Sequence, residues 1–159
     1  MRKSDNFKYS EKEALSILTR LCSKEEKCLA DVRERLYKWR FSANEADRMV
    51  AFLIKEKYID ENRYVSYYAN DKMRFNKWGR LKIAYSLKQK HIPEEIIYHA
   101  LDNIDQEQYI SILKNELGKK LKTLKKESLL KLREKLYRFA ASRGFESDLI
   151  RMAIVDILS

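Results

Sequence analysis

Glycine and proline are scarce in this chain, whose 159 residues include three glycines and one proline. β-Hairpins, bulges and tight loops draw heavily on both residues, so their scarcity predicts an all-α fold. The glycines stand alone at Gly79, Gly118 and Gly144. This separation excludes the glycine-rich nucleotide-binding loops of the Walker and Rossmann kinds.

Cysteine and histidine are also scarce, with two of each. Cys22 and Cys28 are too few for a disulfide scaffold and lack the second pair of a zinc site, so we expect reduced, partly buried thiols. His91 and His99 belong to no visible Ser–His–acid set, and Glu95 with His99 alone is no metal site. We therefore predict a protein that is not an enzyme and needs no cofactor or metal.

Long apolar runs are absent, and none approaches the roughly 18 residues of a membrane span. The start, MRKSDNFKYSEKEA, lacks the apolar core of a signal peptide, so we expect a cytoplasmic protein without a membrane partner. Basic charge is abundant: Lys and Arg number 34 against 24 for Asp and Glu, a net charge of +10. This balance favours a polyanionic partner, either nucleic acid or a protein coated with it.

One apolar pattern occurs three times, with steps of four, five, five, four and three residues. Its members are Val32, Leu36, Phe41, Ala46, Val50 and Leu53; Ile83, Leu87, Ile92, Ile97, Leu101 and Ile104; and Leu136, Ala140, Phe145, Ile150, Ile154 and Ile157. The four-residue and three-residue steps place side chains on one helix face. Each copy therefore predicts two helices, joined by a turn at its third member, which we call the anchor.

Helix-start signals follow each anchor: Ser42 as an N-cap, Pro93 as a first helical residue, and the acids Glu146 and Asp148. A further helix is predicted upstream of each pair, at 13–21, 62–74 and 106–121. The unit is thus three helices, and such short units pack against their neighbours. We predict three tandem three-helix repeats in an elongated, curved body, with a tail at 1–10 and repeats at 11–58, 59–104 and 105–159.

Residues 72–93 carry basic side chains and no acidic one. Phe75, Trp78 and Tyr85 are interleaved with them, which is typical of a polyanion-binding surface. A solvated helix face is the alternative interpretation. We predict partner or DNA contact at Arg63, Lys72, Arg74, Lys77, Trp78, Gly79, Arg80, Lys82, Lys88 and Lys90. Because surface charges add only about 0–1 kcal/mol per pair, reversal of Arg80, Lys82 and Lys88 to Glu should leave the fold intact.

From Tyr58 to Ile83 the chain reads YIDENRYVSYYANDKMRFNKWGRLKI. This stretch resembles the RecX family of regulatory proteins, whose signature joins an Asp-acid-Arg-aromatic helix start to a basic Gly-x-x-Lys/Arg-Ile helix. The matching residues are Asp60, Glu61, Arg63, Tyr64, Lys77, Gly79, Arg80, Lys82 and Ile83. With the threefold repeat, the resemblance covers roughly residues 11–158.

The resemblance implies a protein that binds RecA and the RecA–single-stranded DNA filament. It implies modulation, mostly inhibition, of the recombinase and its ATPase in homologous recombination, DNA repair and the SOS response. We expect a monomer, and direct contact with DNA stays open. Arg40 and His91 stand where the family tends to have Gly, and Cys28 stands where it tends to have Ser. If the backbone there is left-handed, each non-Gly residue costs about 1 kcal/mol.

A helix-turn-helix DNA reader is the rival interpretation of three-helix units. The last helix of the second repeat, PEEIIYHALDNI, is acidic and would repel phosphate, and no recognition row of Asn, Gln or Arg stands out. These observations disfavour base reading. A non-sequence-specific helical DNA-binding protein that acts without RecA remains the alternative.

Overall fold

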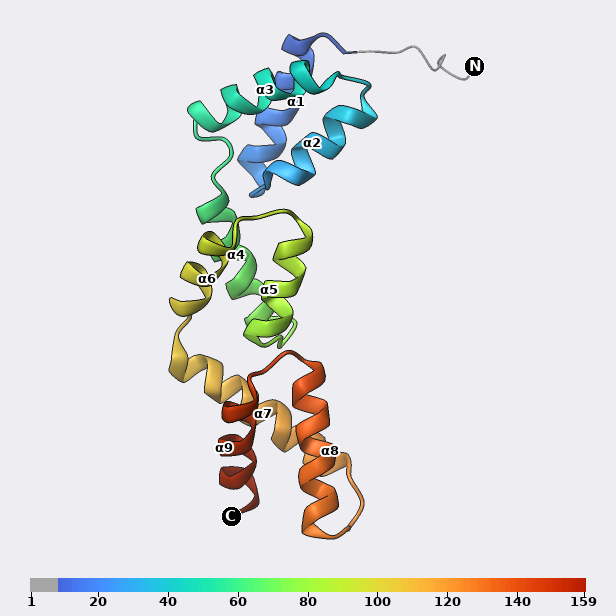
Figure 1. Cartoon of the computed structure of the whole chain (residues 1–159), viewed down its shortest axis with the longest axis vertical. Coiled ribbons are helices and arrows are strands. Elements are labelled where there is room, and N and C mark those ends of the chain that lie inside the picture. The colour runs from blue at the N-terminus through green and yellow to red at the C-terminus, as the bar shows by residue number, and fades with distance from the viewer. Residues whose placement is uncertain (1–8) are drawn as a thin grey trace, which may run out of the picture. The chain divides into compact units, whose positions relative to one another are not determined.

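The chain is helical throughout the part that the computed structural model describes, residues 9–159 (Figure 1). Those residues form nine α-helices and no strand, so the all-α prediction is confirmed. Most of the tail predicted for residues 1–10 lies outside the described residues. The helices are α1 (Glu11–Lys24), α2 (Leu29–Lys38), α3 (Ala43–Lys55), α4 (Glu61–Arg74), α5 (Arg80–Gln89), α6 (Glu94–Asp102), α7 (Gln106–Thr123), α8 (Leu129–Ser142) and α9 (Ser147–Leu158). None of the described helices is long and apolar enough to cross a membrane.

The chain divides into two compact units between Tyr64 and Val65. In the first unit α1, α2 and α3 enclose a core that includes Leu18, Leu36 and Leu53. Ser42 begins α3 with a capping box: its hydroxyl accepts the Glu45 N–H, and the Glu45 carboxylate accepts the Ser42 N–H. Such reciprocal bonds satisfy two amide donors that a helix start otherwise leaves unpaired.

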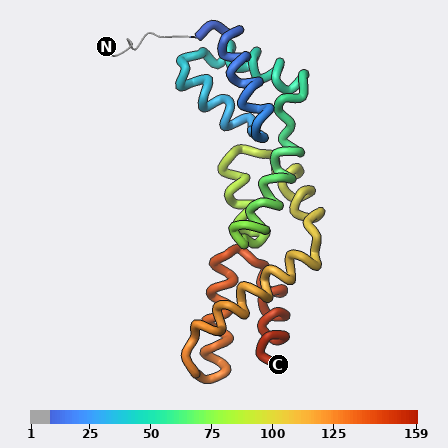
Figure 2. The backbone as a smooth tube through the Cα atoms, turned by 180° about the vertical axis from the view of Figure 1, so that it is seen from behind, coloured from blue at the N-terminus to red at the C-terminus, as the bar shows by residue number. Residues whose placement is uncertain are grey.

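The second unit contains α4 from Val65 onward and all of α5 to α9. Side chains cap the starts of α7 and α8, where Asp105 accepts the Gln108 N–H and Ser128 accepts the Lys131 N–H. α8 and α9 run side by side, and α7 lies across both of them (Figure 2). The core of this unit includes Met73, Leu87 and Leu113, all fully buried.

The threefold apolar pattern forms the core of the molecule. Every member of it is buried except Ile157, which is half-buried. The anchors Phe41, Ile92 and Phe145 are 4%, 4% and 2% exposed. The residues of the repeated apolar pattern are therefore the residues that pack in the core.

The residue before each anchor has a left-handed backbone. The φ angles are 65° at Arg40, 59° at His91 and 90° at Gly144. The Phe41 N–H donates to the Leu36 carbonyl (3.1 Å) and the Phe145 N–H to the Ala140 carbonyl (3.3 Å), as expected of a helix that ends through a left-handed residue. Arg40 and His91 thus occupy positions that favour glycine.

Two local predictions need correction or comment. Pro93 lies at the N-cap of α6, one residue before the first helical position, with ψ at 138°. Cys28 is the N-cap of α2 and makes no capping hydrogen bond through its side chain, so this helix lacks the hydroxyl cap that a serine would supply.

Candidate functional site

The turn between α4 and α5 places the basic and aromatic residues of the second repeat. Its backbone closes through a hydrogen bond from the Trp78 N–H to the Lys72 carbonyl (3.1 Å). Lys77 has a left-handed backbone, with φ at 59°, and its ammonium donates to the Arg74 carbonyl (2.5 Å). The turn therefore brings Trp78 back against the end of α4.

Trp78 gathers two lysines from different helices. The ammonium of Lys72, on α4, lies 5.0 Å from the centroid of a Trp78 ring, and that of Lys82, on α5, lies 4.8 Å from it. Within residues 9–159 neither ammonium is engaged by a carboxylate. Each cation–π contact contributes about 0.5–1 kcal/mol at an exposed site. The indole therefore contacts two ammonium groups that no described carboxylate compensates.

Large apolar side chains accompany these charges. Phe75 is 74% exposed, Leu81 59% and Tyr85 66%. Leu81 and Tyr85 are four residues apart and share one face of α5, while Ile83 and Leu87 are buried on its other side. Large exposed apolar side chains on neighbouring segments are typical of interaction sites. We define the α4–α5 surface as Lys72, Phe75, Trp78, Leu81, Lys82 and Tyr85.

Arg80 is turned inward, although it lies in the same basic run. Its side chain is 17% exposed. The guanidinium donates to the Leu101 carbonyl (3.0 Å), the Glu146 carboxylate (2.9 Å) and the Gln106 side chain (2.7 Å). It also lies over the Tyr109 ring, 4.2 Å from its centroid. Arg80 therefore joins α5, α6, α7 and the start of α9.

Tyr109 and Glu146 complete what we call the Arg80 network. The Arg80 backbone N–H donates to the Tyr109 hydroxyl oxygen (2.9 Å), and that hydroxyl donates to the Glu146 carboxylate. Glu146 is the N-cap of α9 but makes no side-chain capping bond. Its carboxylate is occupied by Arg80 and Tyr109. Burial, reinforced by the Glu146 hydrogen bond, raises the pKa of the Tyr109 phenol well above its usual range.

Gly79 makes a backbone contact between the second and third repeats. Its N–H donates to the Arg143 carbonyl (2.8 Å), and the Leu81 N–H donates to the Gly144 carbonyl (2.9 Å). A Cβ at Gly79 would lie 2.4 Å from the carbonyl carbon and oxygen of Gly144. The glycine of the signature thus allows two turns to touch.

The remaining predicted residues lie in different surroundings. Arg63 belongs to the first unit, where its guanidinium donates to Glu26 (2.5 Å) and to the Lys57 carbonyl (3.1 Å). Lys88 contacts the Tyr98 hydroxyl (2.8 Å), a hydrogen bond that raises the pKa of its ammonium, and also Glu94 (3.4 Å). Arg74 is exposed over the Phe75 ring, and Lys90 is half-buried at the end of α5.

The predicted set therefore divides by role. Lys72 and Lys82 both contact Trp78, and Arg74 at the end of α4 and Lys77 in the following turn lie nearby in the sequence. Gly79, Arg80 and Arg63 serve internal packing. The expectation that Arg80 can be reversed to Glu without cost to the fold is wrong for this residue, because its guanidinium donates hydrogen bonds to α6, α7 and the start of α9.

The sequence reasoning missed Leu81 as an exposed member of the α4–α5 surface. The available signal was its position two residues before Ile83, because an apolar residue on the opposite face of a short helix is not needed by the core. It also missed the Arg80 network. That network joins residues up to 66 positions apart, and no local pattern reports such a contact.

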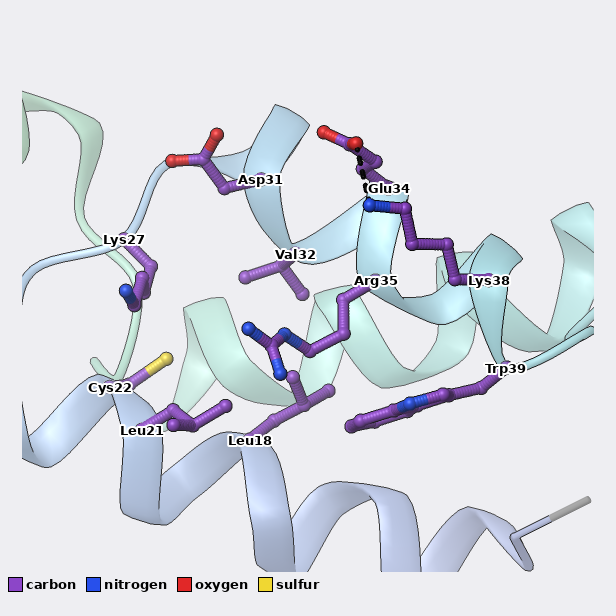
Figure 3. Close-up of a pocket in the computed structure, with 10 residues that line it drawn as sticks. All are labelled: Leu18, Leu21, Cys22, Lys27, Asp31, Val32, Glu34, Arg35, Lys38 and Trp39. Atoms are coloured by element: carbon purple, nitrogen blue, oxygen red, sulfur yellow. Dashed lines mark ion pairs between the residues drawn. The ribbon is translucent and has the colours of Figure 1, made fainter.

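The first unit has a hollow of about 420 Å³ between α1 and α2 (Figure 3). Leu18 and Cys22 come from α1, and Arg35 reaches over Leu18 beside the Trp39 ring, 5.9 Å from its centroid. Burial raises the pKa of the Cys22 thiol, so it stays protonated at neutral pH. The hollow contains none of the predicted binding residues.

Neither cysteine is in a disulfide, and the described side chains contain no cluster of His, Cys, Asp and Glu that could hold a metal ion. Both thiols are buried, Cys22 at 8% and Cys28 at 0% exposure, whereas the sequence predicted partly buried thiols.

Most of the chain is similar in sequence to known proteins. A profile of the second three-helix domain of RecX matches residues 60–101, and a profile of its third three-helix domain matches residues 106–154. The regulatory protein RecX of Clostridium acetobutylicum is 29% identical over 98% of this chain and 72% of its own length. That of Clostridium perfringens strain 13 is 31% identical over 92% of this chain and 67% of its own length.

A solved structure shows the same fold. The crystal structure of RecX from Lactobacillus salivarius matches with a TM-score of 0.84 and 17% sequence identity, over 92% of this chain and 95% of that one. The matched signature residues, the three-helix domains and the similarity in sequence agree with one another. The chain belongs to the RecX family of regulatory proteins.

Proposed function

We propose that this protein binds RecA and the RecA filament on single-stranded DNA, and that it restrains the recombinase and its ATPase during recombination and repair. The α4–α5 surface is the contact. The observation that carries this proposal is the pair of uncompensated lysines held on Trp78, flanked by exposed Phe75, Leu81 and Tyr85. The family membership supports a regulatory role.

The chemistry of the α4–α5 surface suits a nucleoprotein filament. Exposed aromatic and apolar side chains supply area for a protein partner, since such residues dominate the energy of protein interfaces. The two lysines add attraction toward acidic side chains or phosphate, which speeds association with a highly charged assembly. A net charge of +10 acts in the same direction.

In this proposal the protein acts by binding, as a monomer in the cytoplasm, without catalysis of its own. The three repeats at 11–58, 59–104 and 105–159 are its structural units. The Arg80 network and the Gly79 contact hold the α5 start against α7 and α9. They thereby keep the α4–α5 surface on a fixed support.

Binding to RecA tests the proposal directly. The purified protein is titrated against RecA alone, RecA with single-stranded DNA and nucleotide, and the DNA alone, with fluorescence anisotropy as the readout. We expect the assembled filament to bind more tightly than bare DNA. Absence of any interaction with RecA in both forms would contradict the proposal.

The alternative function is non-specific DNA binding without RecA, which the unpaired lysines of the α4–α5 surface also favour. The same titration separates the two functions through salt. Each phosphate contact steepens the dependence of log affinity on log salt by about 0.7 for single strands. Equal affinity for bare DNA and for the filament, with a steep salt dependence in both, would favour the alternative.

A further inference from the structure

The third repeat has an open groove between α8 and α9, with a volume of about 680 Å³. The two helices lie side by side in the second unit (Figure 1). The groove is separate from the α4–α5 surface and shares no residue with it. Tyr137 and Ala141 line it from α8, and Ile154 and Val155 line it from α9.

The floor of the groove is apolar and partly uncovered. Val155 is 58% exposed, and Ala141 is exposed on the facing helix. The Tyr137 hydroxyl is hydrogen-bonded to the Ser147 hydroxyl (2.6 Å), so the polar end of this side chain is already satisfied. The floor therefore offers apolar surface that an apolar side chain of a partner can cover.

The rim of the groove is basic. Arg133 and Arg138 are exposed, and no carboxylate of residues 9–159 pairs with either guanidinium. Arg151 lies over the Tyr137 ring (5.7 Å) and has only a long contact with Asp148 (3.6 Å), a residue that is itself almost fully exposed. Glu134 is the one acidic residue among those that line the groove. Three arginines thus surround an apolar floor with little internal compensation.

A basic rim around an apolar floor favours one class of binding partner over others. Nucleic acid would pair its phosphates with the arginines but would leave the exposed Ala141 and Val155 without an apolar partner. A second copy of this chain would bring a molecule of net charge +10 against the same sign of charge. An acidic protein segment with an apolar side chain satisfies both parts, because its carboxylates pair with guanidinium groups in bidentate geometry.

We propose that the α8–α9 groove is a docking site for an acidic segment of a partner protein, which inserts an apolar side chain between Tyr137 and Val155. Arg133, Arg138 and Arg151 bind its flanking carboxylates. This site is additional to the α4–α5 surface, and its existence does not depend on the identity of the partner that binds there.

The test uses the full chain and a short fluorescein-labelled peptide in which Leu and Phe are spaced among Asp and Glu. A second peptide keeps the acids and replaces Leu and Phe by Ser, and labelled oligo-dT serves as the nucleic-acid probe. Binding is followed by anisotropy at moderate salt. We expect the first peptide to bind at least about tenfold more tightly than the Ser peptide, which corresponds to about 1.4 kcal/mol.

Matched variants locate the binding. Val155→Glu places a charge in the floor, whereas Met152→Glu makes the same kind of change at an exposed α9 residue that does not line the groove. Arg133→Glu with Arg138→Glu reverses the rim, and Lys131→Glu with Lys122→Glu reverses the same charge elsewhere in the repeat. We expect the groove variants to weaken peptide binding about tenfold or more and the control variants to leave it nearly unchanged.

A further variant, Ala141→Trp, fills the groove from α8 and is expected to block binding while circular dichroism shows an intact fold. Equal binding of both peptides, or equal losses in groove and control variants, would overturn the proposal. So would preferential binding of oligo-dT that the groove variants abolish, since the occupant would then be nucleic acid. Concentration-dependent self-association lost in Val155→Glu would assign the groove to a second copy.

Discussion

Gly79 is the residue at which the second and third repeats touch through their backbones. A Cβ there would lie 2.4 Å from backbone atoms of Gly144 and Phe145, and a backbone cannot turn aside as a side chain can. Gly118, by contrast, lies within α7, where an added Cβ would meet nothing within 4 Å. The structure therefore requires glycine at position 79 and gives no reason for it at position 118.

We predict that Gly79→Ala lowers the free energy of unfolding by about 1–3 kcal/mol, because the two turns must separate. Gly118→Ala is the matched control and should raise it by about 0.5–1 kcal/mol, since alanine is the better helix former. Urea unfolding measures both. Equal stability of the Gly79→Ala variant and the unmodified protein would show that the turns can separate without cost.

Arg80 is a charged residue that links α5 to α6, α7 and the start of α9. We predict that Arg80→Ala lowers the free energy of unfolding by about 3 kcal/mol, because Glu146 is left half-buried without its cation. Arg74→Ala, at an exposed residue of the same basic run, should change it by less than about 0.5 kcal/mol. If thermal melting finds the two variants alike, the network is not a source of stability.

Tyr109 makes the stability of the protein depend on pH in the alkaline range. Burial raises the pKa of its phenol in the folded protein, whereas the unfolded chain ionises near pH 10. As pH rises through about 10, the unfolded state loses this proton and the folded state keeps it, so stability falls with rising pH.

We therefore predict that the unmodified protein loses more stability between about pH 9.5 and about pH 11 than Tyr109→Phe does, by up to about 1.4 kcal/mol per pH unit. Urea titrations of both proteins at each pH measure the difference. Parallel loss in the two proteins would mean that Tyr109 ionises as readily in the folded state as in the unfolded one.

The turn before each anchor has the same backbone conformation in all three repeats but not the same residue. Arg40, His91 and Gly144 occupy equivalent positions with φ at 65°, 59° and 90°, but only the third is glycine. A non-Gly residue in this conformation costs about 1 kcal/mol. The chain keeps the left-handed geometry at all three turns because each anchor must enter the core.

We predict that His91→Gly raises the free energy of unfolding by up to about 1 kcal/mol. Gly144→Ala should lower it, because its φ is unfavourable for alanine and a Cβ would lie 2.4 Å from the Lys82 Cβ. Thermal melting of the two variants measures the contrast. A destabilised His91→Gly variant would indicate that the imidazole makes a contact worth more than the backbone strain.

The helices and their core were predictable from the sequence because they depend on local spacing. The repeated steps of four and three residues located α2, α3, α5, α6, α8 and α9, and the residues after each anchor located the starts of α3, α6 and α9. The aromatic and basic residues of the α4–α5 surface were predictable in kind for the same reason. The role of Arg80 was not predictable from the sequence. Arg80 and Lys82 are both basic residues of the same run, and they differ in that α7 and the start of α9 place Tyr109 and Glu146 beside Arg80.

The α8–α9 groove was also beyond sequence reasoning. The apolar floor needs Tyr137 and Val155, which come from two helices that meet only after folding. At the scale of single elements, then, a sequence predicts which helix faces are apolar. Which of those faces stay uncovered depends on tertiary packing.

At the scale of the whole molecule, charge and apolar surface are combined twice. The α4–α5 surface carries Lys72 and Lys82 around Trp78, and the α8–α9 groove carries three arginines around an apolar floor. Both lie in the unit that the Arg80 network and the Gly79 contact hold together. A member of the RecX family with two such surfaces is suited to bind a partner at more than one point.

Inhibition of the DNA-dependent ATPase of RecA by the variant Lys72→Glu/Lys82→Glu tests the central claim most directly. Lys125→Glu/Lys126→Glu is the matched control, because it makes the same change of charge between α7 and α8. The account predicts that the first variant loses most of the inhibition with little change in melting temperature, while the control inhibits like the unmodified protein. Undiminished inhibition by a folded Lys72→Glu/Lys82→Glu variant would contradict it.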